Sequence, residues 1–258
     1  MEGLSWGRMP AKSTPQAHLA ADFRRRLVAW FRRHGRDLPW RRTRDPYAVL
    51  VSEVMLQQTQ VARVVEYYPR FLGEFPSIRR LAAASPAMVR EQWEGLGYYR
   101  RAANLHRLAR DVVRRYGGRL PDDPGELRRL PGVGPYTAGA VACFAFEQPV
   151  PAVDTNIARV LRRAFHPRLT RNAAAAKRLW ATAAALIPRK GKATWLFNQA
   201  IMELGALICT ARIAHCDRCP VAGVCDTGRR ALATRRLANE AGQPRRVRSG
   251  PGPRSTRH

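Results

Sequence analysis

The amino-acid sequence predicts an all-α protein. Apolar residues recur every three or four positions over long stretches, as expected for helices that bury one face. Clusters of proline and glycine separate these stretches, and no run alternates apolar and polar residues for long enough to indicate a β-strand. The chain has 258 residues, of which 45% are hydrophobic, so it can bury a sizeable core. We therefore expect about ten helices joined by turns.

The predicted helices follow one another along the middle of the chain. The helical period is clearest over residues 23–31, 50–68 and 105–113, and motifs such as "FPS", "SPA" and "EQPVPAVD" interrupt it. The two ends, residues 1–21 and 227–258, are small, polar or basic and lack a sustained apolar period. We expect flexible basic tails there.

The charge of the chain indicates a polyanionic partner. The sequence contains 46 basic and 19 acidic residues, which gives a formal net charge of +27. Nucleic acid is the first candidate and an anionic membrane surface the second. The apolar run at 138–146 is too short to cross a bilayer, and the N-terminus lacks the apolar core of a signal peptide. We therefore expect a protein of the cytosol or nucleoid, whose cysteines are reduced.

The stretch "LPGVGPYTAG", Leu130–Gly139, predicts two helices joined by a tight turn. Gly132 and Gly134 suit positive φ and close approach of the backbone, while proline is tolerated in the first turn of the second helix. The amides of Gly132, Val133 and Gly134 can hold a phosphate at that helix N-terminus. An ordinary helix–turn–helix connection has the same composition, and the basic charge of the chain favours phosphate binding.

Four cysteines in the segment "CTARIAHCDRCPVAGVC" indicate a metal centre. They have the spacing C-x6-C-x2-C-x5-C and are Cys209, Cys216, Cys219 and Cys225. Four thiolates in so short a segment could hold zinc or a [4Fe–4S] cluster on chemistry alone. Cys143 lies apart from them in an apolar helix, where we expect it to pack as a small core residue.

Two acidic residues stand in suggestive surroundings. Glu53 lies within "VLVSEVMLQQTQV", where apolar neighbours could raise a carboxyl pKa towards neutrality. Taken alone, Glu53 is more typical of a solvated helix face, and Asp154 in "VDTN" is equally typical of a helix N-cap. Tyr98 and Tyr99 can likewise be read as packing at an exposed helix end.

Several motifs together resemble a known family. The hairpin followed by "PAVDTN" is similar to the helix-hairpin-helix glycosylases of base-excision repair, and "LPWR", "SEVMLQQTQV" and "GLGYYRRAANLH" resemble their adenine DNA glycosylase (MutY) branch. The resemblance covers about residues 22–226. It implies a two-lobed fold, with a helical barrel over 44–151 and an iron–sulfur lobe from 22–43 and 152–226.

The resemblance also implies a mechanism. Glu53 would protonate adenine at N7 and then activate water, while Asp154 would stabilise the sugar cation directly or as a transient covalent partner. Asn156 would hydrogen-bond near Asp154, and Tyr136 would line the pocket and position Asp154 or the water. Relatives that resemble endonuclease III carry a Schiff-base lysine at the position of Tyr136. A phenol cannot form that imine, so we expect base removal that leaves the abasic site intact.

Further roles follow from the same motifs. Tyr98 would wedge beside the orphan base, Gln58 would probe the stack with Thr59 next to it, and the adenine pocket would contain Trp40, Arg41, Leu56 and Glu203. The four cysteines would hold a [4Fe–4S] cluster. Arg212 and Arg218 in the cysteine loop would contact the DNA backbone.

The sequence departs from the family at two points. Thr155 replaces the usual glycine of "VDGN", which we expect to alter the approach of the backbone to the sugar. Typical MutY proteins continue into a domain that checks for 8-oxoguanine, and the short basic tail cannot build one. The expected substrate is adenine opposite 8-oxoguanine or guanine in double-stranded DNA, bound by a monomer. Removal of thymine or uracil opposite guanine, and non-catalytic DNA binding, remain the alternatives.

Overall fold

A computed structural model describes residues 17–170 and 172–241, and the regular structure in this part of the chain is helical. An isolated β-bridge joins Cys209 to Ala214. The all-α prediction is therefore confirmed. The elements are α1 (Ala17–His34), η1 (Pro39–Arg41), α2 (Pro46–Leu56), α3 (Val61–Glu74), α4 (Ile78–Ala83), α5 (Pro86–Gln92), α6 (Arg100–Tyr116), α7 (Pro124–Arg128), α8 (Pro135–Phe144), α9 (Thr155–Phe165), α10 (Ala173–Leu186), α11 (Gly191–Leu207), η2 (Ala222–Val224) and α12 (Asp226–Ala241).

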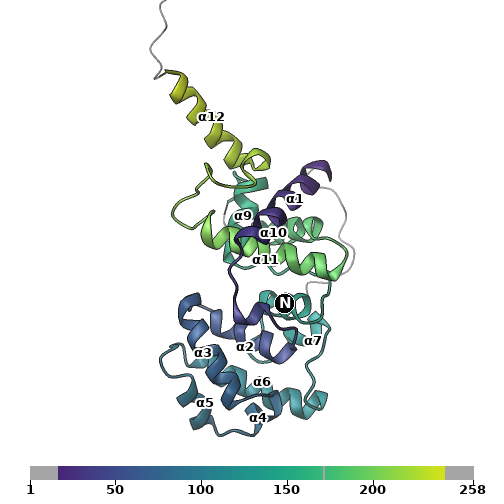
Figure 1. Cartoon of the computed structure of the whole chain (residues 1–258). Helices are drawn as coiled ribbons and strands as arrows, with labels where there is room; N and C mark the ends of the chain where they lie inside the picture. The colour runs from purple at the N-terminus through teal and green to yellow at the C-terminus, as the bar shows by residue number, and fades with distance from the viewer. Residues whose placement is uncertain (1–16, 171, 242–258) are drawn as a thin grey trace, which may run out of the picture.

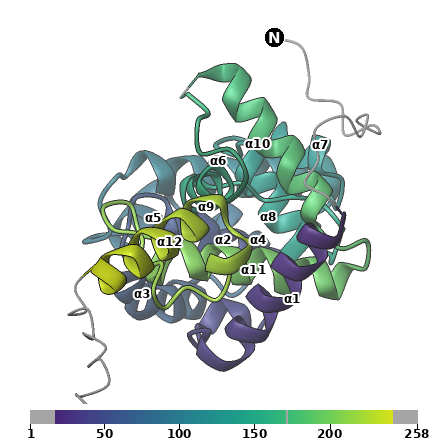
Figure 2. The same ribbon diagram turned by 90° about the horizontal axis from the view of Figure 1, so that it is seen from above.

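Two hydrophobic cores give the molecule two lobes (Figure 1). The first core is formed by α2–α8 and contains the fully buried Trp93 and Phe71. The second is formed by α1 and α9–α11 together with the cysteine segment, around Phe23 and Phe197. In the view from above, the second lobe lies over the first (Figure 2). Trp40, which we expected in the iron–sulfur lobe, packs in the first core, edge-on to Tyr68 with ring centroids 5.6 Å apart.

The hairpin between α7 and α8 has the predicted form at Gly132 but not at Gly134, which has a φ of −90° and open space where a Cβ would lie. Gly132 has a φ of +79°, and a Cβ there would lie 2.9 Å from the Cβ of Asn104 on α6, so the turn requires glycine. Pro135 is the first residue of α8, and no side chain caps that helix. Val133 is buried in the first core. The turn is thus anchored by its middle residue, while α8 starts with amides that no side chain of its own satisfies.

The chain passes from the first lobe to the second through residues 151–154, which lie against α8. A Cβ on Gly139 of α8 would come within 2.3 Å of the carbonyl oxygen of Pro151. The glycine therefore lets the crossing segment rest on the helix backbone. This contact fixes the segment that leads into Asp154 and α9.

Helix α12 corrects the expectation of a flexible tail from residue 227. Residues 226–241 are rich in alanine, arginine and leucine, which favour helix. Asp226 in the first turn forms ion pairs with Arg229 and Arg230, at the spacing that stabilises a helix. Figure 1 shows α12 extending beyond the rest of the fold. Helix α1 also begins earlier than expected, at residue 17, and the remaining tail residues lie outside the described part of the chain.

None of the helices that the structure describes combines the length and the apolar character needed to cross a bilayer.

Gly139→Ala is expected to lower the free energy of unfolding by about 1–3 kcal/mol, because the new methyl group collides with the Pro151 carbonyl. Gly73→Ala on α3 is the matched control. Nothing lies within 4 Å of a Cβ there, so the change should be neutral or stabilising by up to about 1 kcal/mol. Urea denaturation of both variants measures the difference, and equal stabilities would contradict the proposed close contact.

Candidate active site

A cleft of about 1070 Å³ lies between the two lobes. It is lined by the end of α2, the start of α8, the start of α9 and the middle of α11. All of the expected catalytic and substrate-binding residues except Tyr98 line it, namely Trp40, Arg41, Glu53, Leu56, Gln58, Thr59, Tyr136, Asp154, Asn156 and Glu203. The fold therefore brings together residues that are up to about 160 positions apart in the sequence.

Glu53 is an acid held in a buried site. Asp45 caps α2 through a 2.7 Å hydrogen bond from the Ala48 amide, and nearly the whole helix is then buried against α3, α6 and α8. Burial raises the pKa of Glu53 to about 7, a hydrogen bond from Tyr136 opposes the rise, and the nearby charge of Asp154 adds to it. The Oε2 atom of Glu53 is buried and has no hydrogen-bond partner among the described residues. A carboxyl group in this state can deliver a proton at neutral pH.

Asp154 is both the N-cap of α9 and a wall of the cleft. Its Oδ1 accepts a 2.7 Å hydrogen bond from the Ile157 amide, and its Oδ2 accepts one of 2.9 Å from Asn156 Nδ2. Burial raises the pKa of Asp154, and these hydrogen bonds together with Arg159 oppose the rise. The N-terminus of α9 also favours a negative charge here. Asp154 can therefore be the N-cap of α9 and a residue of the candidate site at the same time.

Tyr136 lies next to both carboxyl groups. It stands in the first turn of α8, and burial together with the charges of Glu53 and Asp154 raises its pKa well above the ordinary value. The phenol is thus a neutral hydrogen-bond donor between the two acids.

Thr155 requires no unusual backbone. It is the first residue of α9, its side chain is exposed, and it is not among the described residues with positive φ. A β-branched residue is therefore accommodated without strain.

Glu203 has the opposite environment to Glu53. Its Oε1 accepts hydrogen bonds from the backbone amide and Nε of Arg36, and its Oε2 accepts from Arg36 Nη2 and Arg41 Nη2, at 2.8–3.0 Å. Burial alone would raise the pKa of Glu203, but these arginines lower it to about 2. Arg41 also donates to Gln199 Oε1 and to the Arg36 carbonyl. The acceptor positions of Glu203 are filled by arginine, so it orients Arg41 within the cleft.

Arg36 and Gln199 complete this network, and sequence reasoning missed both. Arg36 shares the short segment that carries "LPWR", but its partner Glu203 lies 167 residues away. The sequence contained two partial signals for this network. Arg36 precedes a short 3-10 turn that ends at Arg41, and Glu203 is an acidic residue within the largely apolar helix α11.

The expected DNA-contacting residues lie on exposed segments. Gln58 and Tyr98 are non-glycine residues with positive φ, at +58° and +49°, and the Tyr98 side chain is 58% exposed. Arg212 and Arg218 are exposed in the cysteine loop. Strained backbone at exposed positions is often found where a protein contacts a ligand.

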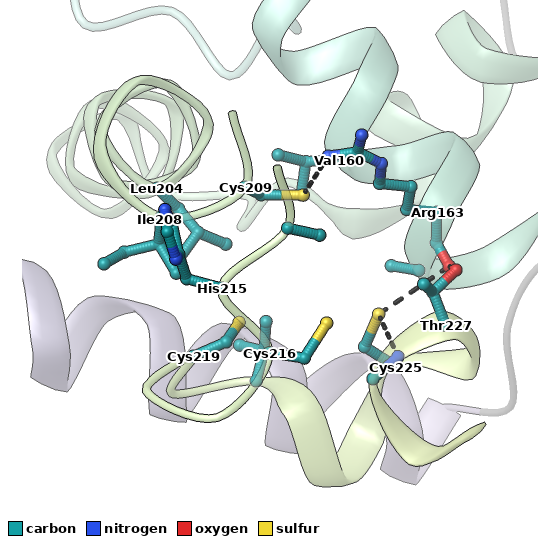
Figure 3. A pocket seen from close by; sticks show the side chains of 14 residues that line it. Val160, Arg163, Leu204, Ile208, Cys209, His215, Cys216, Cys219, Cys225 and Thr227 are labelled. Carbon is teal, nitrogen blue, oxygen red and sulfur yellow. Dashed lines mark hydrogen bonds between the residues drawn. The ribbon is translucent and has the colours of Figure 1, made fainter. Parts of the chain in front are cut away.

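The four cysteines of the loop border one pocket between α9, α11 and η2 (Figure 3). Arg163 Nη1 donates a 3.2 Å hydrogen bond to Cys209 Sγ, and the Gly228 amide donates one of 3.4 Å to Cys225 Sγ. Within the described ranges, no three His, Cys, Asp or Glu side chains are grouped as a single metal ion would require. Cys143 lies elsewhere, buried in the first core, where Asn198 Nδ2 donates to its Sγ at 3.2 Å.

Comparison with known proteins assigns these features to a family. Residues 51–183 match the model of the HhH-GPD superfamily base excision DNA repair proteins. An adenine DNA glycosylase of Mycobacterium tuberculosis is 47% identical over 196 residues, which are 76% of this chain and 64% of that protein. A thymine-DNA glycosylase of Aeropyrum pernix is 38% identical over 78% of this chain and 92% of that protein.

A solved structure of a thermostable thymine-DNA glycosylase superposes with a TM-score of 0.76 and 32% identity, over 83% of this chain and 98% of that one. The chain thus spans less than two thirds of the length of the mycobacterial protein, 64%, and almost the whole of the thymine glycosylases.

The two buried glutamates should respond in opposite ways to the same substitution. The folded-state pKa of Glu53, about 7, exceeds its ordinary value of 4.5, so its ionisation destabilises the fold as pH rises through that interval. Glu53→Gln should therefore raise the free energy of unfolding at pH 8 by about 3 kcal/mol, a gain that disappears near pH 4.5. Glu203→Gln should lower it at pH 8 by about 3 kcal/mol, because Arg36 and Arg41 lose their partner.

Urea denaturation at pH 5, 6.5 and 8 measures both effects. Stabilisation by Glu53→Gln that is equal at all three pH values would contradict the raised pKa. Stabilisation by Glu203→Gln at pH 8 would contradict the ion-pair network.

Proposed function

Because this chain belongs to the HhH-GPD superfamily of base excision DNA repair proteins, we propose that it is a monomeric DNA glycosylase that removes mispaired adenine from double-stranded DNA and leaves an abasic site. The observation that carries the proposal is the pair of carboxyl groups in one cleft, the buried Glu53 and the half-buried Asp154, in different surroundings. The likeness to adenine DNA glycosylases supports adenine as the excised base. The net charge of +27 supports DNA as the partner.

Cleavage of an N-glycosidic bond needs an acid for the departing base and a negative charge for the sugar. Glu53, with a pKa of about 7, is largely protonated in slightly acidic solution and can donate its proton to the base. Its Oε2 has no hydrogen-bond partner among the described residues, so no other group in this part of the chain holds that proton. Asp154, fixed by the α9 amides, supplies a carboxylate for the oxocarbenium-like sugar. Glu53, once ionised, can take a proton from the attacking water.

Tyr136 makes a second contribution. As a neutral donor to Glu53, it stabilises the ionised carboxylate that remains after proton transfer. It also occupies the position at which the resemblance to endonuclease III would call for a lysine. No amine is therefore available there to attack the sugar, which supports cleavage of the base alone.

DNA would lie across the cleft. The α8 N-terminus and the hairpin amides of Gly132 and Gly134 would hold a phosphate, whereas the Val133 amide donates to the Leu130 carbonyl at 3.2 Å. Exposed Arg212 and Arg218 would contact the DNA backbone. Trp40 and Leu56 supply apolar walls for the base, while Arg41, held by Glu203, supplies directional donors.

The cysteine loop fits a [4Fe–4S] cluster. Cys209, Cys216, Cys219 and Cys225 would hold it, and N–H groups of Arg163 and Gly228 already donate to two of the sulfurs, as expected around thiolates. When bound, the cluster would supply four iron–thiolate bonds that stabilise the loop carrying Arg212 and Arg218.

Removal of thymine or uracil opposite guanine is a second candidate. The specific observation in its favour is the thymine-DNA glycosylase of A. pernix, almost all of whose length matches this chain. The same acid, carboxylate and tyrosine would serve that reaction, so the two candidates differ in the base that the cleft accepts.

We expect single-turnover excision of adenine opposite 8-oxoguanine or guanine, with strand breakage only after alkali. The rate should be constant at low pH and fall above about pH 7, because Glu53 must be protonated. Glu53→Gln should lower it by at least about a hundredfold. Duplexes with thymine or uracil opposite guanine are tested in parallel. Product from these alone would select the second candidate, and DNA binding without product from any duplex would contradict a glycosylase.

We expect the purified protein to contain about four iron atoms per chain, together with sulfide. Replacing Cys216 by serine should reduce the iron content, while Cys143→Ala is the matched control because Cys143 lies in the first core. Metal analysis measures both. Zinc at one atom per chain in place of iron would contradict the cluster.

A further inference from the structure

Arg101, near the start of α6, holds the end of α2 through one side of its guanidinium. The side chain is buried, with 8% of its surface exposed. Its Nη1 donates to the carbonyl oxygens of Val54 at 3.0 Å and Met55 at 2.7 Å, and also to that of Gln57. These carbonyls belong to the last turn of α2 and the residue after it, where backbone acceptors lack partners within the helix. Arg101 therefore caps the segment that leads into Gln58.

The other terminal nitrogen of the guanidinium, Nη2, reaches both the Gln58 segment and a second segment before Tyr98. Nη2 donates to Thr59 Oγ1 at 2.9 Å and to the carbonyl oxygens of Leu96 and Gly97, both at 3.2 Å. The guanidinium carbon also lies 5.4 Å from the ring centroid of Tyr98. One buried side chain thus binds the backbone carbonyl before Gln58, the Thr59 hydroxyl after it, and the backbone immediately before Tyr98.

Both segments have backbone conformations that need support. Gln58 and Tyr98 have φ values of +58° and +49°, which are unfavourable for residues with a Cβ. Gly95 and Gly97, beside Tyr98, also have positive φ. The bonds from Arg101 connect to the residues that flank these strained positions. Without them, each segment could relax independently to an ordinary conformation.

The charge of Arg101 is balanced by dipoles and rings. Among the described residues no carboxylate pairs with it, and its Nε has no hydrogen-bond partner. Its guanidinium faces the negative end of the α2 dipole and lies 5.4 Å from the Trp93 ring. Because Arg101 forms no salt bridge within the described ranges, its contribution to the structure comes from the hydrogen bonds by which it joins several neutral acceptors.

We propose that Arg101 is a positioning residue that couples the Gln58 segment to the Tyr98 segment, so that both enter the duplex in one fixed arrangement. This inference rests on the proposed function, because it assumes that Gln58 and Tyr98 meet DNA. A planar fork with donors on two sides is needed to join two segments. Lysine at position 101 would keep the charge but could reach acceptors on one segment only.

The first measurement is hydrogen exchange of the full chain without DNA. Arg101→Lys should speed amide exchange over residues 56–60 and over 95–99 together, with little change elsewhere. Arg107→Lys is the matched control, because Arg107 lies on the same helix, is exposed, and bonds only to Asn104. Faster exchange in one segment alone, or in neither, would overturn the coupling.

The second measurement is single-turnover excision at saturating protein. Arg101→Lys should slow excision by on the order of a hundredfold, as expected when groups that prise the duplex open are misplaced. Gln58→Ala should slow the parent protein but have little further effect in the Arg101→Lys background, because the arrangement is already lost. Multiplicative effects would overturn the proposal, as would unchanged excision by Arg101→Lys.

The two measurements separate the inference from the proposed function. If the parent protein excises no base from any duplex, the proposed function fails, and the exchange data still decide whether Arg101 couples the segments. If the parent protein excises the base, and both Arg101→Lys and Arg107→Lys excise it at the same rate as the parent, the proposed function stands and the inference fails.

Discussion

The packing of α2 against α8 is the contact on which the site depends. Nearly every residue of α2 is buried, so the carboxyl group of Glu53 is removed from water together with the helix that carries it. The start of α8 brings Tyr136 to that carboxyl, and Gly139 lets the crossing segment lie on the same helix and deliver Asp154. The raised pKa of Glu53 is therefore a consequence of how two helices pack, and it would be lost if α2 were a surface helix.

Two buried glutamates in one cleft are given different chemistry by their partners. Glu53 has one donor and a free oxygen, which leaves it able to gain and lose a proton near neutrality. Glu203 is equally buried but receives four hydrogen bonds from two arginines, which keep it ionised and occupied. Burial alone does not decide the role of an acidic residue. The number and charge of its donors do.

The sequence could predict the helices and the hairpin from local patterns, and the residues of the cleft from a family resemblance. Helical period and glycine placement are local properties. Glu53 and Asp154 were identified through a family resemblance, because the local pattern of Glu53 is more typical of a solvated helix face and that of Asp154 fits an N-cap equally well. Helix α12 was misjudged because arginine suggested a tail, although arginine and alanine also favour helix. Arg101 did leave a signal that was missed. It has helical spacing with Leu105, Leu108 and Val112, and so is a charged residue on the apolar face of α6.

The two lobes must be held in a fixed relation, because the acid belongs to the first core and Asp154 begins a helix of the second. The Glu203 network provides that connection. Glu203 stands on α11 of the second lobe, and it holds Arg41, whose neighbour Trp40 is packed in the first core. Arg101 performs a similar task within the first lobe, between two exposed segments. In both places an arginine adds polar bonds between elements that also pack together, because its donors can reach several acceptors at once. The site is thus assembled by apolar packing and aligned by buried guanidinium groups.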